Sequence, residues 1–439
     1  MRNITSAFKE QLNNDNRRYL EWIDITLKDG TVLNLRESDV WGYGLKVEDA
    51  VSDSSEFKIG SAIVNKATVT LNNIYDDFSN YDFEGATIVC YVGLRISPSG
   101  LEFPKDVPWI DVNGNTILDI DGNEIYIKYD DAEIERIRLC TMTVVDAPYQ
   151  NSSILTLTCQ DNMMKFDKDY SESKLQYPAT RSEIIRDACK VCGVSLQTVT
   201  FANDDYIIQE RPADEQLTFR QVISWTAQIG GQWCRCDSYG RLCIAWYDLG
   251  SYEADTLPNG KYITIKSYDS LSVNNEDVVI TGVKVTEYLE DASADKQATS
   301  YQYGTDGYVI EIKDNKLIVE GTGEAIATMI GKRIVGMKFR PFSTSMMNNP
   351  AIEAGDICVI SDRKGNTYRS LITSSTFQVG NKQNVECGAK SGVATILVKH
   401  STGERAVFFE RSTAVEPEFL DAHKQLIDNS FILHINGRH

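Results

Sequence analysis

The stretch from Arg340 to Thr373 constrains the fold of this chain more than any other part of its sequence. A helical pattern rich in small and apolar residues leads into it, Pro341 ends that pattern, and Gly355 with Asp356 turns the chain. Two alternating segments, residues 357–360 and 368–373, then lie on either side of a polar turn. We interpret this order of elements as part of an antiparallel β-barrel, and it contains no catalytic motif.

Length and charge limit the classes of protein to which the chain can belong. With 439 residues it is too long for one hydrophobic core, so we expect two to four domains. A net charge of −19 argues against a nucleic-acid-binding protein and against an anionic membrane surface as partner, because both partners require clustered Lys and Arg. An acidic wall would instead let passing DNA slide.

The N-terminal region shows no sign of export. Residues 1–20 are charged and lack an apolar core, so no secretory signal is expected, and no segment approaches the roughly 20 apolar residues of a membrane span. We therefore expect the protein to be made in the cytosol and kept there until release, with no membrane insertion and with its ten cysteines reduced. Four of these cysteines could form a zinc site, but buried core thiols are the favoured interpretation for Cys189, Cys192, Cys234 and Cys236.

The first 165 residues predict an antiparallel β-barrel. Ile4, Phe8 and Leu12 recur at helical spacing and indicate a short amphipathic helix at the start. Alternating apolar and polar residues then predict strands over 23–27, 31–35, 67–71, 86–92, 134–145 and 154–159.

A β-hairpin insertion is predicted over residues 97–131. Its sequence repeats after eight residues, DVNGN from Asp111 and DIDGN from Asp119. A calcium loop around Gly122 would place Ile117 and Lys128 at the two positions that need carboxylates, so we interpret the repeat as turn residues.

Aromatic residues of this insertion are the candidate contacts with a partner. We expect Trp109, Tyr126 and Tyr129 to be presented on the hairpin. The remaining tryptophans within periodic segments are expected in the core, namely Trp22, Trp225, Trp233 and Trp246.

Residues 166–255 predict a small α+β domain. Two capping boxes, Thr180 with Glu183 and Thr218 with Gln221, begin helices that end at glycines. A hairpin over residues 232–247 follows directly.

Residues 256–391 predict a second antiparallel β-barrel. Strands are expected over 262–265, 278–286, 308–312 and 317–320, followed by a helix over 324–335. A C-terminal extension, 392–439, holds strands over 394–398 and 405–410, an amphipathic segment over 417–428 and all four histidines. The predicted fold is therefore mainly β, with two barrel domains flanking a helix-helix-hairpin domain.

No active site emerges from the sequence. Gly321-Thr322-Gly323 superficially resembles a dinucleotide turn, but Ile326 stands at the third glycine position. No histidine precedes His400, and no Gly-x-Ser-x-Gly motif is present. We predict no catalytic, cofactor or metal residues, although 63 acidic residues leave a two-carboxylate glycosidase open as an alternative.

Three stretches resemble the central hub protein of contractile phage baseplates and the related tail-associated protein of siphophage tail tips. They are residues 217–225 leading into 233–246, residues 277–283 and residues 350–356. The resemblance covers roughly residues 15–390, and the insertion and the C-terminal extension depart from the common pattern.

The resemblance implies a structural virion protein of a bacteriophage or prophage tail. It implies a homotrimer whose paired barrels form a ring between the six-fold tail tube and a three-fold spike or tip. The distal tail or tail tube protein would bind one face, and a spike, fibre, tape-measure protein or lysin the other, with DNA passing through the channel. The alternatives are a cell-wall-degrading glycoside hydrolase and a receptor-binding module that carries the insertion against host glycans.

Overall fold

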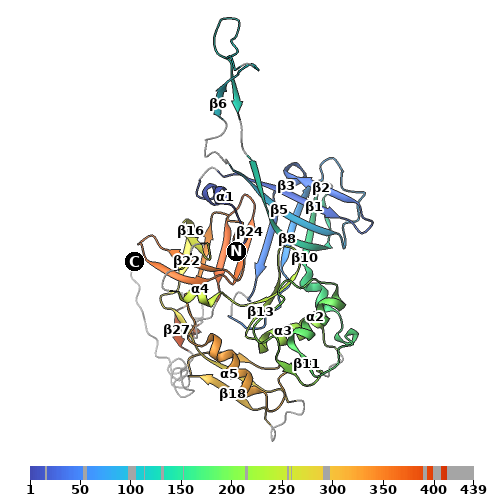
Figure 1. The fold of residues 1–439 in the computed structure, drawn as a ribbon, viewed down its shortest axis with the longest axis vertical. Helices are drawn as coiled ribbons and strands as arrows, with labels where there is room; N and C mark the ends of the chain where they lie inside the picture. The colour runs from blue at the N-terminus through green and yellow to red at the C-terminus, as the bar shows by residue number, and fades with distance from the viewer. Residues whose placement is uncertain are drawn as a thin grey trace.

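A computed structural model shows a mainly β protein with a few helices (Figure 1). It describes residues 1–412 except for 15–16, 53–56, 97–104, 113, 130–132, 152, 213–215, 255–256, 259, 290–296, 389–392 and 399–406. The expected mainly β class is confirmed. Among the described strands no pairing closes a sheet into a barrel, so the barrel architecture is not confirmed, and the domain boundaries stay predictions.

One sheet of twelve strands joins the first part of the chain to the last. Its order is β16-β21-β25-β24-β3-β4-β10-β8-β5-β1-β2, with β9 paired to β10. The two groups of strands meet where β24 pairs antiparallel to β3, with Phe377 opposite Val47. The strands are β1 (Tyr19–Thr26), β2 (Val32–Arg36), β3 (Val40–Ala50), β4 (Lys66–Asn72), β5 (Thr87–Ile96), β8 (Glu133–Asp146), β9 (Tyr149–Asn151), β10 (Ile154–Asp161), β16 (Tyr268–Val273), β21 (Phe342–Met346), β24 (Ser374–Gln378) and β25 (Gln383–Cys387).

Alternation of apolar and polar residues explains the strands of the first part. β10 buries every second side chain, among them Leu155 and Leu157, and pairs with β4 and β8. The predicted N-terminal helix is α1 (Ser6–Gln11), which begins at Thr5 and buries Phe8 in the same core. The strands predicted in this region are confirmed.

The sequence-based prediction missed β3, the strand that connects the two groups. Gly42 and Gly44 flank Tyr43 and interrupt the alternation that marks a strand. The structure accommodates them in a bulge between Val40 and Leu45, where Tyr43 adopts a φ of +59°. A Cβ at position 44 would lie 2.5 Å from the carbonyl oxygen of Trp41, so the bulge requires glycine there.

The middle of the chain folds as the capping boxes predict. The helices α2 (Arg181–Cys192) and α3 (Phe219–Ile229) begin at Thr180 and Thr218, and both capping boxes are complete. A hairpin of β13 (Trp233–Cys236) and β14 (Leu242–Ala245) follows. Short elements surround them, namely η1 (Glu37–Asp39), η2 (Asn162–Asp167), η3 (Tyr170–Glu172), β11 (Ala179–Thr180), β12 (Ile207–Ile208) and α4 (Leu249–Glu253).

Two smaller sheets and a helix complete the last part. The predicted hairpin of residues 357–373 is formed by β22 and β23, and β15 adds to β22 in parallel. A second sheet consists of β18, β17 and β19, with β20 paired to β17, and α5 packs near it. The bounds are β15 (Ile263–Ile265), β17 (Val278–Thr286), β18 (Ser300–Gly304), β19 (Tyr308–Ile312), α5 (Gly323–Ile334), β20 (Lys338–Phe339), β22 (Ile357–Ser361) and β23 (Thr367–Leu371).

The strand expected over residues 317–320 is wrong. Leu317 and Ile318 lie in a buried turn, and the apolar run that suggested a strand fills the core there. Asn315 fixes this turn, because its side-chain amide donates to the Trp225 carbonyl at 3.0 Å and to Gln228 at 2.9 Å.

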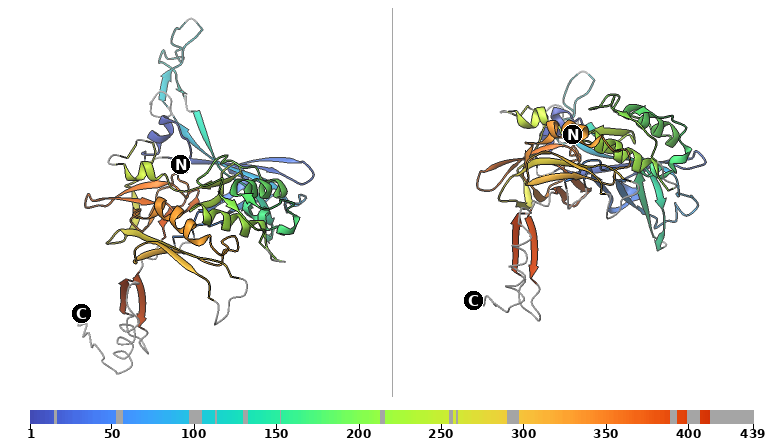
Figure 2. Two further views of the ribbon diagram at one scale, coloured as in Figure 1. Left: turned by 60° about the horizontal axis from the view of Figure 1, so that its bottom comes forward. Right: turned by 90° about the horizontal axis from the view of Figure 1, so that it is seen from below.

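The C-terminal strands β26 (Val393–Val398) and β27 (Val407–Ser412) pair as a hairpin that extends away from the other sheets (Figure 2). The amphipathic segment expected over 417–428 and the four histidines lie outside the described residues. In the described part of the chain, no helix has the length and apolar character needed to cross a membrane.

Candidate functional site

The insertion forms an arm that projects beyond the large sheet along the long axis of the molecule (Figure 1). We use "arm" for residues 105–129, which contain the paired strands β6 (Lys105–Pro108) and β7 (Tyr126–Tyr129). Three backbone hydrogen bonds hold its outer part together, from Trp109 N to Ile125 O, from Ile117 N to Trp109 O and from Ile125 N to Ile117 O, at 2.7 to 3.0 Å. These bonds join three residues spaced eight positions apart into a closed ring, and the paired strands and the two turns all begin from that ring.

Both repeats close into the same five-residue turn. The Asp119 Oδ1 atom accepts hydrogen bonds from the backbone N–H groups of Asp121 and Asn123, at 2.9 and 2.8 Å. Asp111 accepts from Asn115 N at 2.8 Å in the same way, and a glycine with φ of +84° precedes the asparagine in each turn. The carboxylates are therefore engaged by the turns themselves, in agreement with the interpretation as turn residues.

The predicted partner contacts occupy different positions on the arm. Trp109 is 47% exposed and Tyr126 is 55% exposed, with the Tyr126 hydroxyl donating to Glu124 at 2.8 Å. Tyr129 lies on β7, and its side chain is outside the described residues. The partner role of these three residues stays a prediction.

Sequence reasoning missed the most exposed side chains of the arm. Val112 and Ile120 are 101% and 102% exposed, and each is the second residue of one turn. Ile110 and Leu118 are also more than half exposed. The signal was present in the eight-residue repeat, because the second position of a closed turn points away from its own backbone hydrogen bonds.

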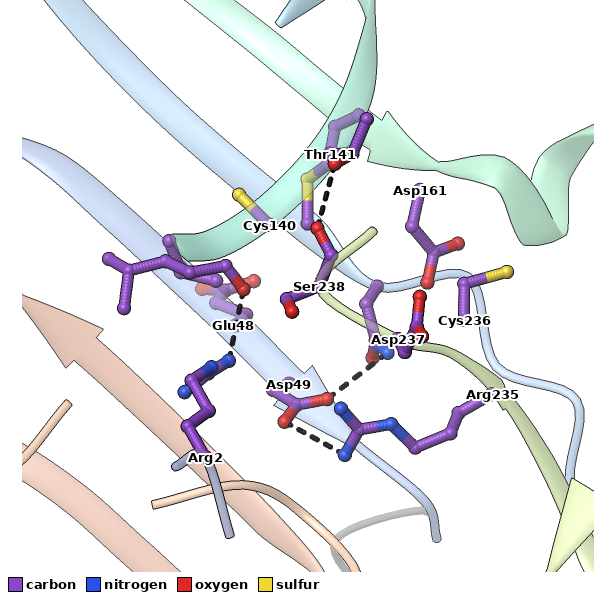
Figure 3. Close-up of a pocket in the computed structure, with 14 residues that line it drawn as sticks. Arg2, Glu48, Asp49, Cys140, Thr141, Asp161, Arg235, Cys236, Asp237 and Ser238 are labelled. Carbon is purple, nitrogen blue, oxygen red and sulfur yellow. Dashed lines mark hydrogen bonds and ion pairs between the residues drawn. The ribbon is translucent and has the colours of Figure 1, made fainter. Parts of the chain in front are cut away.

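A second candidate is a buried charge cluster where three parts of the chain meet (Figure 3). Arg235 of β13, only 6% exposed, pairs with Asp49 of β3 at 3.2 Å and with Glu353 of the loop before β22 at 3.1 Å. Asp49 also accepts from the backbone N–H of Ala354 at 2.9 Å. We call Arg235, Asp49 and Glu353 the junction cluster.

Attraction between opposite charges offsets the cost of burying the junction cluster. Burial opposes the charge on Glu353, but the guanidinium groups of Arg2 and Arg235 outweigh it and lower the pKa of Glu353 to about 2. Burial likewise opposes the charge on Arg235, and Asp49 with Glu353 outweighs it, so the pKa of Arg235 is raised. Glu353 and Arg235 therefore both keep their charge because oppositely charged groups lie beside them.

Asp161 also lines this region, and the pKa of its carboxyl group is shifted in the opposite direction to that of Glu353. Burial raises its pKa to about 7, and its Oδ2 atom has no hydrogen-bond partner among the described residues. Its Oδ1 atom accepts from the Met163 N–H at 3.0 Å and so caps η2. The cavity that Asp161 lines with Asp49 and Arg235 has a volume of about 20 Å³, room for one water and too small for a sugar ring.

A larger cleft, of about 390 Å³, holds the carboxylates of Asp277 and Glu253. Burial alone would raise the pKa of Asp277, but Arg340 and Lys338 outweigh it and lower that pKa. A glycosidase acid needs the opposite shift, so Asp277 is unsuited to donate a proton near neutral pH.

The four cysteines considered for zinc are buried in the core of the middle region. Burial raises the pKa of Cys189 to about 12 and that of Cys192 to about 11, which favours the neutral thiol. Metal binding needs the thiolate, so this environment disfavours a zinc site.

No family model matches the sequence, and no curated protein matches it. Solved structures do. The matching structures include phage tail and baseplate proteins. The 43 kDa tail protein of prophage MuSo2 from Shewanella oneidensis is 13% identical, with a TM-score of 0.46 over 83% of this chain and 97% of that one.

Two further solved structures that match this chain are also of tail proteins. A prophage tail protein from Listeria monocytogenes is 10% identical, with a TM-score of 0.48 over 84% of this chain and 95% of that one. A tail protein from Neisseria meningitidis is 9% identical, with a TM-score of 0.45 over 83% of this chain and 95% of that one.

Proposed function

We propose that this chain is a structural protein of a bacteriophage or prophage tail, the trimeric hub or tail-tip platform that adapts a six-fold tail tube to a three-fold spike or tip. The observation that carries the proposal is the open sheet that runs through the first and last parts of the chain. Its end strands, β2 and β16, each pair on one side only among the described strands. An unpaired edge invites another strand, and three copies around an axis would cover such edges.

The partners follow from this arrangement. The distal tail or tail tube protein would bind one face of the ring, and a spike, fibre or tape-measure protein the other, within the virion tail. The net charge of −19 suits a channel wall along which DNA passes without binding. Trp109, Tyr126 and Tyr129 would contact a neighbouring component, and no catalytic step is required.

Negative-stain imaging of the purified chain and mass spectrometry of purified parent particles test the proposal. We expect three-fold rings in the images and this chain among the tail proteins. A chain that forms no rings and is absent from particles would refute it. Release of sugars from peptidoglycan by the purified chain, lost in E253Q, would instead support the hydrolase alternative.

A further inference from the structure

The outer part of the arm exposes apolar side chains that its own fold does not need. Six large apolar residues are exposed within it, and none of them belongs to either buried core: Trp109, Ile110, Val112, Leu118, Ile120 and Tyr126. Removing such side chains from water is favourable, roughly in proportion to their apolar area. Their exposure on a projecting element therefore indicates a surface that is covered in use.

The same turn elsewhere in the chain provides an internal comparison. Asp362 accepts hydrogen bonds from Lys364 N and Asn366 N at 2.9 and 2.8 Å, and Gly365 has a φ of +86°. The second residue of that turn is Arg363, which is exposed. A further turn of this kind begins at Asp237 and has Ser238 in second place.

This comparison separates turn formation from the choice of side chain. The body turns form with Arg or Ser at the second position, so the geometry does not demand an apolar residue there. The arm has a β-branched aliphatic residue at that position in both repeats, Val112 and Ile120. Folding does not account for this choice, whereas contact with another molecule does.

Charge and side-chain type narrow the identity of that molecule. Residues 109–126 contain four carboxylates and no Lys, Arg or His. Like charge disfavours a second copy of the arm, and it also disfavours nucleic acid and anionic membranes or wall polymers. The fully exposed tips are aliphatic and offer neither an aromatic face nor hydrogen bonds to a sugar.

We propose that the arm docks on another protein by burying Val112 and Ile120 against an apolar surface bordered by Lys and Arg. The two tips supply the buried apolar contact, and the carboxylates of Asp121 and Glu124 face the basic border. The inference goes beyond the proposed function, because it fixes the chemistry of the partner surface.

Site-specific photo-crosslinking in cells that express the full chain from its own locus tests this inference. Leu118 lies between the two tip residues in the sequence and is 52% exposed, so a photoreactive residue in its place reports what covers this part of the arm. We expect one protein adduct, whose crosslinked peptide lies in an apolar surface flanked by Lys or Arg. The double variant V112S/I120S should reduce the adduct roughly 100-fold, because two apolar side chains leave the contact.

The matched control is R363S, which changes the same turn position on the body and should leave the adduct unchanged. D121N/E124Q should reduce the adduct and weaken its sensitivity to salt. Absence of an adduct, an adduct with a second copy of this chain, with glycan or with an acidic surface, or an adduct that survives V112S/I120S would each overturn the inference.

Particle content is scored separately by mass spectrometry. An adduct formed by a chain that is absent from tails would uphold the arm's docking role and refute the tail function. A chain that is present in tails but forms no adduct would uphold the tail function and refute the arm's docking role.

Discussion

The junction cluster and the arm distribute their side chains in opposite ways. At the junction, charged groups of three distant segments are buried against one another, with Arg235 at the centre. On the arm, apolar groups stand in water at the tips of two turns. Charges inside and apolar residues outside both run against the usual tendency of folded chains.

We infer from this contrast that the two regions have different roles. Every charge at the junction has a partner within the chain, so the cluster is explained as a link that holds β3, β13 and the loop before β22 together. The apolar tips of the arm lack an equivalent explanation within the chain. Perturbing the first region should therefore alter stability, whereas perturbing the second should alter association.

Removing the central guanidinium should have the largest effect on stability. R235M leaves Asp49 buried without its cation and leaves Glu353 with only Arg2 and the N-terminal ammonium group, so we expect a loss of about 3–5 kcal/mol in the free energy of unfolding. Urea denaturation followed by tryptophan fluorescence measures this. The control R220M breaks the more exposed pair with Asp167 and should cost far less; equal losses would show that the junction has no special role.

Asp161 should make stability depend on pH in a defined direction. Because its pKa is raised to about 7 from an ordinary value of 3.8, the native state keeps a proton that the unfolded state releases between these values. Stability contributed by the neutral form is therefore lost as pH rises from about 4 to 7.

D161N should remove this dependence while still capping η2. Between pH 4.5 and 7.5, we expect the free energy of unfolding of the variant to rise by on the order of 1–3 kcal/mol relative to that of the wild type. Glu353 acts in the opposite sense, since its lowered pKa makes stability fall only as pH drops from about 4.5 to 2. A difference between D161N and wild type that does not change with pH would contradict the raised pKa.

The turns offer a smaller and more local test. D362A removes the acceptor for two backbone N–H groups in the hairpin of β22 and β23, so we expect a measurable fall in the unfolding midpoint. D119A removes the equivalent contacts on the arm and should only speed amide exchange at Asn123. Hydrogen exchange with mass spectrometry distinguishes these outcomes, and global destabilisation by D119A would argue that the arm packs on the body.

Changing the tips themselves should affect stability least. V112S/I120S replaces residues that are fully exposed, so the midpoint of thermal unfolding should stay within experimental error of the wild type. Differential scanning calorimetry checks this. A clear loss of stability would mean that these side chains are buried within the folded chain after all.

The sequence predicted local structure better than the connection between its parts. Thr180 with Glu183 and Thr218 with Gln221 identified helix starts, because capping depends on residues three apart. The pairing of β24 with β3 could not be predicted from the sequence, because it joins residues more than 300 positions apart. In addition, Gly42 and Gly44 interrupt the alternating pattern by which β3 could have been recognised as a strand.

The two candidate sites also differ in how far the sequence predicts them. The repeat of Asp111 and Asp119 predicted the turns of the arm, since each carboxylate bonds to N–H groups two to four residues ahead. The junction cluster left no trace in the sequence, because Arg235, Asp49 and Glu353 become neighbours only through the tertiary fold.

The molar mass of the purified full chain, measured by light scattering during size-exclusion chromatography over a range of concentrations, is the decisive test of the proposed trimeric assembly. We expect a trimer, three copies of 49.3 kDa or about 148 kDa, that persists on dilution to the working range of the detector. A mass of 49.3 kDa at every concentration would contradict it.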